Sequence, residues 1–235
     1  MKSKQLLSFL ILLYTHHHAI SQPLSDSEAV QSYTTSPAAR DRLYNGPLYS
    51  GYDHHSQGHP FFLSDTLLTG SISYDGIVFP YVRLSYDLAK DVVIMKNTQK
   101  DIDFQLLPEK LQYFTVAQHR FLYLTSDSTA VDLPSTGFYE ELYHGKATAL
   151  CRHEKVLQYI GRAEENLSHY RQYDFYYLQV KGRYYSIHSE RNMLDAFGPD
   201  KTRIRDFVKR SHLSFRKDPT TTLAKTAEYY SKSDN

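Results

Sequence analysis

Short alternating segments separated by turn residues constrain the fold of this chain more than any other feature. Between Phe61 and Leu150, apolar and polar residues alternate in stretches that recur roughly every 8–12 residues. Asp75-Gly76 separates two of these stretches and is typical of a hairpin turn, because glycine adopts a positive φ without steric cost. The pattern predicts antiparallel strands. It excludes a parallel nucleotide-binding sheet, because strands do not alternate with helices.

The aromatic composition agrees with a sheet. The chain has 21 Tyr and 12 Phe but no Trp, and large flat side chains pack well on a pleated, half-buried surface. Ile72 and Tyr74 fall on one face of a strand that begins at Gly70. Pro80 restricts part of the following strand to an edge or a bulge.

The spacing of apolar residues along the chain changes towards the C-terminus. Residues 152–172 are charged and irregular, and we expect a loop region there. A second hairpin follows, with Lys181-Gly182 as its turn. Three helices are then predicted, beginning after Ser189, after Pro199-Asp200 and at Asp218-Pro219, because serine and aspartate cap helix N-termini and proline fits the first turn.

These signals predict an α+β, mainly β fold, in which an antiparallel curled sheet or incomplete barrel has C-terminal helices packed on it. Each helix has a narrow apolar stripe, and the sheet is the only surface large enough to cover three such stripes. The expected divisions are a signal peptide (1–21), an extended leader (22–60), an antiparallel β domain (61–187) and a C-terminal helical segment (188–235).

The N-terminus predicts export. Lys2 and Lys4 precede an apolar run at residues 6–13, and Ala19-Ile20-Ser21 is a small-x-small cleavage site. The apolar run is too short for a membrane-spanning helix, which needs roughly 20 residues. We therefore expect a periplasmic or secreted protein with no transmembrane segment after cleavage. The alternative, that residues 16–18 (His-His-His) are an expression tag, explains less of this pattern.

Cys151 is the single cysteine of the chain, so the fold has no intrachain disulfide. It lies far from the cleavage site and cannot carry the lipid of a bacterial lipoprotein. Arg152 and His153 could lower the pKa of its thiol, but no oriented base is identifiable. We interpret Cys151 as a semi-buried strand residue.

The charge of the chain is nearly balanced, with 27 basic and 26 acidic residues. Residues 181–217 hold 10 basic and 4 acidic side chains, interleaved on predicted helices. This pattern is typical of a solvated helix face, or of a surface complementary to the acidic remainder. No nucleic-acid partner is expected of an exported chain.

The densest histidine group is the predicted loop from Asp53 to His59. Histidine is the commonest metal ligand near neutral pH, and Asp53, His54, His55 and His59 are the candidate metal ligands of the sequence. Their spacing matches no established zinc motif, and HExxH is absent. We assign no metal and no cofactor, and we keep a hydrolase using this loop as an alternative.

No catalytic residue is assigned. GxSxG is absent, and the carboxylate pairs Glu140-Glu141 and Glu164-Glu165 are adjacent in sequence. Neighbours on a strand point to opposite faces, so the first pair cannot act as an acid–base couple. The second pair is expected in a solvated loop.

Several short motifs resemble one group of proteins. They are Gly70-Ser-Ile-Ser-Tyr74-Asp-Gly, Val82-Arg-Leu84-Ser-Tyr86-Asp87, Gly137-Phe138-Tyr139-Glu-Glu-Leu142 and the tail ending in Glu228-Tyr229-Tyr230. With them the chain resembles uncharacterised exported β-rich proteins of Bacteroidota-type Gram-negative bacteria. The resemblance implies an exported compartment and this rough fold, and it implies no activity or site residue.

The function expected from the sequence is therefore a non-enzymatic binding or interaction protein. Its ligand would be apolar or a saccharide held in the concavity of the sheet, or its aromatic face would contact a protein partner of the envelope. The alternatives are the hydrolase that uses the loop from Asp53 to His59 and a structural envelope component.

Overall fold

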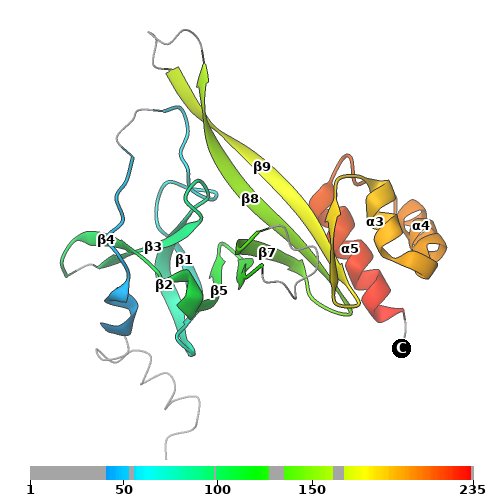
Figure 1. Cartoon of the computed structure of the whole chain (residues 1–235), viewed down its shortest axis with the longest axis horizontal. Coiled ribbons are helices and arrows are strands. Elements are labelled where there is room, and N and C mark those ends of the chain that lie inside the picture. The colour runs from blue at the N-terminus through cyan, green and yellow to red at the C-terminus, as the bar shows by residue number, and fades with distance from the viewer. Residues whose placement is uncertain (1–40, 53–55, 98, 127–134, 161–166, 234–235) are drawn as a thin grey trace, which may run out of the picture.

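The computed structural model describes residues 41–52, 56–97, 99–126, 135–160 and 167–233. It shows ten strands in one antiparallel, strongly curled sheet, with three helices packed near one end (Figure 1). The strand order is β10-β9-β8-β7-β6-β5-β1-β2-β3-β4. The strands are β1 (Leu68–Tyr74), β2 (Ile77–Asp87), β3 (Val92–Asn97), β4 (Ile102–Gln105), β5 (Leu111–Val116), β6 (His119–Leu124), β7 (Gly137–Tyr143), β8 (Ala147–Ile160), β9 (Leu167–Val180) and β10 (Arg183–Ile187). The predicted fold class is confirmed.

Short turns explain most of this order, because nearly every strand pairs with its neighbour in the sequence. Asp75 and Gly76 between β1 and β2 have φ of 53° and 77° and form the predicted hairpin turn. Lys181 and Gly182 have φ of 50° and 80° and connect β9 to β10. Among the described strands, the one pairing between strands that are not consecutive in the sequence is that of β1 with β5, which joins the β1–β4 meander to the rest of the sheet.

The three predicted helices are present, and each begins at or directly after its predicted N-terminal residues. They are α3 (Glu190–Ala196), α4 (Lys201–Arg210) and α5 (Pro219–Lys232). The side chains of Ser189 and Asp218 accept hydrogen bonds from the backbone N–H of Asn192 and Thr221, which caps α3 and α5. Gly198 follows α3 with φ of 54°, as expected of a residue that ends a helix. Three short 3-10 turns are η1 (Arg42–Asn45), η2 (Pro108–Lys110) and η3 (Gly198–Asp200).

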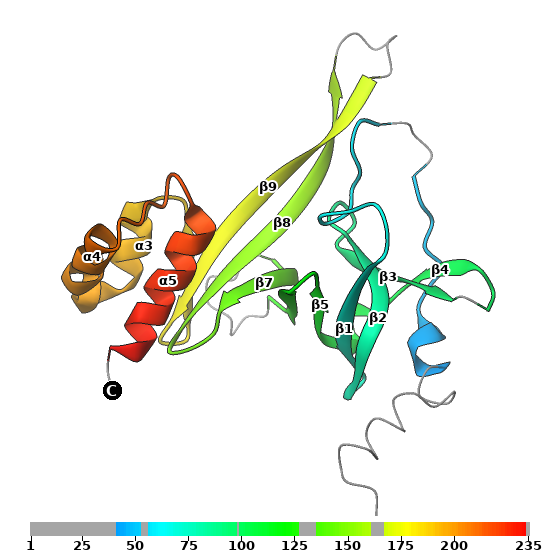
Figure 2. The same cartoon turned by 180° about the vertical axis from the view of Figure 1, so that it is seen from behind.

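The expected loop at 152–172 is wrong for its described residues. They belong to β8 and β9, which pair from Ala147–Val180 to Ile160–Leu167 and form a long ribbon across the molecule (Figures 1 and 2). Charged residues are accommodated in these strands because they have partners: His153 pairs across the ribbon with Asp174, and Arg152 pairs with Asp91 and Glu154. The many charged residues of this segment concealed the two-residue alternation of a strand, which is evident from the pairing of β8 with β9.

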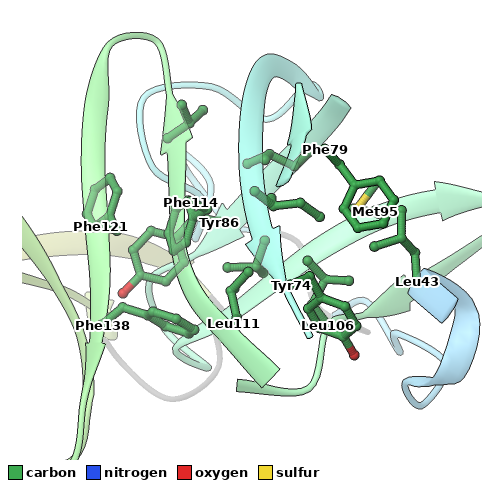
Figure 3. Packing of buried hydrophobic residues seen from close by; sticks show 14 of the residues in the cluster. Leu43, Tyr74, Phe79, Tyr86, Met95, Leu106, Leu111, Phe114, Phe121 and Phe138 are labelled. Carbon is green, nitrogen blue, oxygen red and sulfur yellow. The ribbon is translucent and has the colours of Figure 1, made fainter. Parts of the chain in front are cut away.

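Two main hydrophobic cores lie along the sheet, and a small third cluster is formed by Tyr139, Leu150 and Tyr177. The first fills the concave side of the curled half, where Phe114 and Phe121 stack with centroids 4.8 Å apart and Tyr86 meets both edge-on (Figure 3). The second lies between the ribbon and the helices, where Ala149 and Leu178 of the sheet pack against Leu223 of α5 and the other helices. The concavity that the sequence offered for a ligand is therefore filled by aromatic side chains.

The described segment before β1 crosses the sheet, in agreement with the extended leader that the sequence predicted. We call residues 56–67 the strap. Gln57 bridges in parallel to His169 at the outer edge of β9, and Phe61 bridges to Asp87 at the end of β2. Further upstream, η1 departs from the extended leader and buries Leu43 in the first core.

No helix in the described part of the chain is long and apolar enough to cross a bilayer. The expected signal peptide, the histidine triplet and Glu164-Glu165 lie outside the described residues.

Candidate functional site

A small cleft lies on the outer face of β2–β4, opposite the aromatic core. Leu84 and Tyr86 of β2 point into the core, so the intervening Ser85 points to the other face. Ser85 pairs directly with Ile94 of β3, and both side chains are buried. The cleft above them has a volume of about 210 Å³. Its lining residues are Tyr49, Phe61, Asp65, Leu67, Ser85, Ile94, Lys96 and Asp103.

Asp87 fixes one wall of this cleft. Its fully buried carboxylate accepts hydrogen bonds from the hydroxyls of Tyr49 at 2.8 Å and Tyr52 at 2.7 Å. It also accepts the backbone N–H groups of Ala89 and Lys90 at 2.9 and 3.1 Å. Burial and the bond to Asp87 raise the pKa of both tyrosines, so each hydroxyl keeps its proton and donates it. Of the two tyrosines, Tyr49 lines the cleft, and its ring is anchored there by the bond to Asp87.

Two lysines hold the backbone around the cleft. The ammonium of Lys90 donates to the carbonyls of Ser50 and Gly51 at 2.6 and 3.2 Å and lies over the ring of Tyr52. The ammonium of Lys155, from β8, donates to the carbonyls of His59 and Phe61 at 3.0 and 2.7 Å and ties the strap to the ribbon. The cleft is therefore held in shape from both sides.

The floor of the cleft contains a hydroxyl without a partner. The Oγ atom of Ser85 is buried and makes no hydrogen bond to any described residue, and the residue as a whole is only 6 % exposed. At the rim, Lys96 of β3 and Asp103 of β4 are opposite each other in the strand register, and Asp65 lies on the strap. The Lys96 ammonium also pairs with Asp101 at 2.7 Å.

A second polar group lies in the middle of the sheet, between the two cores. Nε2 of His153 is 2.7 Å from Oε2 of Glu140, and Nδ1 of His153 is 2.7 Å from Oδ1 of Asp174. Sγ of Cys151 lies 3.7 Å from the same Nδ1. Nδ1 of His119 contacts the other oxygen of Glu140 at 2.5 Å. Four neighbouring strands, β6 to β9, supply this cluster.

The electrostatics of the cluster favour a charged imidazole. Burial disfavours the charge of His153, but the hydrogen bonds to Asp174, Cys151 and Glu140 outweigh it and raise its pKa to about 11. The same bonds outweigh burial at Glu140 and Asp174 and lower their pKa values. Burial raises the pKa of the Cys151 thiol.

This arrangement is not a cysteine-protease triad. In a triad, the nucleophile and the orienting carboxylate contact opposite nitrogens of the histidine. Here Cys151 and Asp174 approach the same nitrogen, and Glu140 occupies the other. The thiol is fully buried as well, so a substrate carbonyl cannot reach it.

The residues proposed from the sequence have different outcomes. Asp53, His54 and His55 lie outside the described residues. His59 lies on the strap with its ring against Phe61, and burial lowers its pKa. It does not belong to the cluster of potential metal ligands found among the described residues.

The strand assignments near the mid-sheet cluster are confirmed. Cys151 lies on β8 as predicted, but the expectation of a semi-buried residue is wrong, because β8 is an interior strand of the sheet and Cys151 is fully buried. Glu140 and Glu141 point to opposite faces: Glu140 contacts the histidines, whereas Glu141 pairs with Arg120 at 3.2 Å. The cluster itself was not predicted from the sequence. The available signal was the spacing of Cys151 and His153, which places both side chains on one face of a strand. The partners of these two residues come from other strands.

Comparison of the chain with protein-family models, with curated protein sequences and with solved structures returned no match.

Proposed function

We propose that this chain is an exported, non-enzymatic binding protein whose cleft between the strap and β2–β4 holds one saccharide-sized ligand. The observation that carries the proposal is the unpartnered hydroxyl of Ser85 on the floor of a cleft walled by the rings of Tyr49 and Phe61. A buried hydroxyl without a partner costs roughly 1–3 kcal/mol. A ligand that hydrogen-bonds to it recovers that cost.

The lining matches a molecule with one flat apolar face and several hydroxyls. Aromatic rings supply a flat apolar surface, and Asp65 and Asp103 offer acceptors for ligand hydroxyls. Lys96 and Ser85 offer donors. A few polar groups in a mainly apolar cleft are what orients a small ligand.

The size of the cleft limits the ligand. About 210 Å³ lies below the roughly 300–1,000 Å³ of pockets for drug-sized molecules. We therefore expect a single sugar ring, or the end of a longer chain. The anchoring by Asp87, Lys90 and Lys155 preorganises the walls, so little ordering cost accompanies binding.

The first experiment is native mass spectrometry of the chain purified without refolding, followed by calorimetric titration with glucose, N-acetylglucosamine and glucosamine. We expect saturable one-to-one binding of at least one of these sugars. In the variants Ser85→Ala and Asp103→Asn, the affinity should fall by up to about tenfold each, the equivalent of one lost hydrogen bond.

The matched control is Ser73→Ala. Ser73 is also a buried strand serine, but its hydroxyl donates to Gln112 at 3.1 Å and does not line the cleft. This variant should bind the sugar as the unaltered chain does. The proposal is wrong if none of the three sugars binds, or if binding is unchanged in both cleft variants.

Ser85→Ala also has a stability signature. Because the hydroxyl has no partner, its removal should leave the free energy of unfolding unchanged or raise it by up to about 1 kcal/mol. Ser73→Ala should lower it by about 1 kcal/mol. Urea unfolding of both variants without sugar measures the contrast. An equal loss in both would show that Ser85 has a structural partner.

A further inference from the structure

The mid-sheet cluster of Cys151, His153, Asp174 and Glu140 is set by the positions of these residues on three neighbouring strands. Cys151 and His153 lie two residues apart on β8 and therefore share a face. Asp174 lies directly opposite His153 on β9, and Glu140 lies directly opposite Cys151 on β7. Strand register thus brings a thiol, an imidazole and a carboxylate together without any loop.

Three potential ligand atoms converge in this cluster. Sγ of Cys151, Nδ1 of His153 and one carboxylate oxygen of Asp174 all lie within 4.8 Å of one another. In a tetrahedral zinc site, with Zn–S of about 2.3 Å and Zn–N of about 2.0 Å, sulfur and nitrogen are roughly 3.6 Å apart. The Sγ–Nδ1 distance here is 3.7 Å.

The Asp174 oxygen must move outward. It lies 2.7 Å from Nδ1, whereas oxygen and nitrogen on a tetrahedral zinc ion are roughly 3.3 Å apart. The side chain of Asp174 is 36 % exposed, so it can make this small movement without disturbing the core. Its exposure also gives an ion a path from solvent.

Glu140 supplies a second, independent indication. A histidine that binds a metal through one nitrogen almost always donates the other N–H to a carboxylate or a carbonyl, which fixes the ring. Oε2 of Glu140 holds Nε2 of His153 at 2.7 Å in this way and leaves Nδ1 directed at Cys151 and Asp174. Phe62 covers the ring, with centroids 5.3 Å apart, and supplies an apolar shell.

We propose that Cys151, His153 and Asp174 bind one zinc ion through Sγ, Nδ1 and a carboxylate oxygen, with water in the fourth position. A mixed sulfur, nitrogen and oxygen set suits Zn²⁺ and does not suit Mg²⁺ or Ca²⁺, which prefer oxygen ligands alone. Binding requires a thiolate and a free Nδ1 lone pair. The thiol proton and the Nδ1 proton therefore pass to solvent as the ion enters.

The site is separate from the cleft and does not depend on the proposed sugar. Its ligands come from β8 and β9, which supply Ala149 and Leu178 to the second core, and His153 contacts Phe62 of the first core. An ion there links the two strands at the junction of the cores. Any ligand that binds the folded state and not the unfolded state raises the unfolding temperature, and zinc should do so.

The test uses the full mature chain, stripped of metal with a chelator and titrated with Co²⁺ as a spectroscopic substitute for Zn²⁺. We expect one Co²⁺ per chain, a near-ultraviolet thiolate-to-cobalt charge-transfer band, displacement by Zn²⁺, and loss of the band on unfolding in urea. Mg²⁺ and Ca²⁺ should not displace the ion.

Variants separate the roles within the site. Cys151→Ser should abolish the charge-transfer band. Asp174→Asn should weaken Zn²⁺ binding while the fold, checked by circular dichroism, persists, because the Asp174 side chain is 36 % exposed. Glu140→Gln should lower the zinc affinity by about 10- to 100-fold, as expected for a residue that orients a ligand.

His188→Gln is the matched control, because His188 lies beyond β10 with Ser186 as its hydrogen-bond partner. It should bind Co²⁺ as the unaltered chain does. The proposal is overturned if the unaltered chain shows no charge-transfer band at one Co²⁺ per chain. It is also overturned if Asp174→Asn binds zinc as tightly as the unaltered chain.

Discussion

His153 shows how much a single side chain can depend on its position in a sheet. One charged ring lies between Glu140 and Asp174, and its own side chain is only 9 % exposed. Two carboxylates on neighbouring strands are compatible with one buried site because the imidazolium separates them. Loss of that charge leaves Glu140, which is also largely buried, facing only His119.

His153→Gln should therefore destabilise the metal-free protein strongly. We expect the free energy of unfolding to fall by about 3–5 kcal/mol, the usual result of breaking a buried ion pair from one side. Urea unfolding in the presence of a chelator measures it. His144→Gln is the control, because the His144 side chain is 76 % exposed and its change should cost no more than about 0.5 kcal/mol. Similar losses in both variants would contradict a buried ionic cluster.

At the scale of elements, the strap is held to the sheet by a few specific bonds. Its backbone donates from Phe62 to the carbonyl of Tyr86, and Leu88 donates to the carbonyl of Pro60. Between them, Lys155 donates to two strap carbonyls, and burial lowers the pKa of its ammonium. A lysine so placed positions the strap and, with it, the ring of Phe61 in the cleft.

Lys155→Met should loosen the strap while its apolar stem still packs. We expect faster hydrogen exchange at the amides of Phe62 and Leu88, because local opening no longer breaks the two lysine bonds. Lys181→Met, in the exposed turn between β9 and β10, should leave both rates unchanged. Unchanged exchange in Lys155→Met would show that the backbone bonds alone hold the strap.

The capping of α5 gives a second prediction at this scale. Asp218 accepts the Thr221 N–H at 2.9 Å. Asp218→Ala should lower the free energy of unfolding by about 1 kcal/mol. Asp218→Asn should retain most of the stability that the cap contributes, because the asparagine side chain can also accept this hydrogen bond. The bonds to Thr221 hold the pKa of Asp218 below 3.8. Its contribution is therefore present above about pH 4 and is lost as the pH falls through the lowered pKa. Equal stability of the Ala and Asn variants would exclude the cap.

At the scale of the whole molecule, one continuous sheet contributes side chains to both main cores. β8 and β9 run beside the helices (Figure 1), where they carry Ala149 and Leu178 of the second core. Further along, His153 of β8 contacts Phe62 of the first core. The second core therefore depends on side chains of these strands, and the first core contacts them through Phe62 and His153. The described residues should thus unfold as one cooperative unit.

Leu223→Ala tests this coupling. Leu223 is fully buried against the sheet, and its truncation should cost about 2–5 kcal/mol. We expect far-ultraviolet circular dichroism and the tyrosine near-ultraviolet signal to shift together to lower urea. Val156→Ala, on an exposed part of the ribbon, should cost less than about 1 kcal/mol. A separate early transition of the helices would contradict a single unit.

The sequence alone determined the features that depend on neighbours along the chain. The hairpin turn at Asp75-Gly76, the caps at Ser189 and Asp218, and the alternation that buries Ile72 and Tyr74 were all readable and are confirmed. Each rests on local backbone preference or on side-chain period, which a few adjacent residues fix.

Only the tertiary structure decided which distant residues meet. The charged stretch after Cys151 concealed a strand, because its charges are satisfied by partners elsewhere in the fold. His153 pairs with Glu140 on β7 and Asp174 on β9, and Arg152 pairs with Asp91. The concavity predicted for a ligand is filled by aromatic rings, and the cleft lies on the opposite face, where residues far upstream cover Ser85. Strand register and chain crossing set these contacts, and neither is encoded in any short window of sequence.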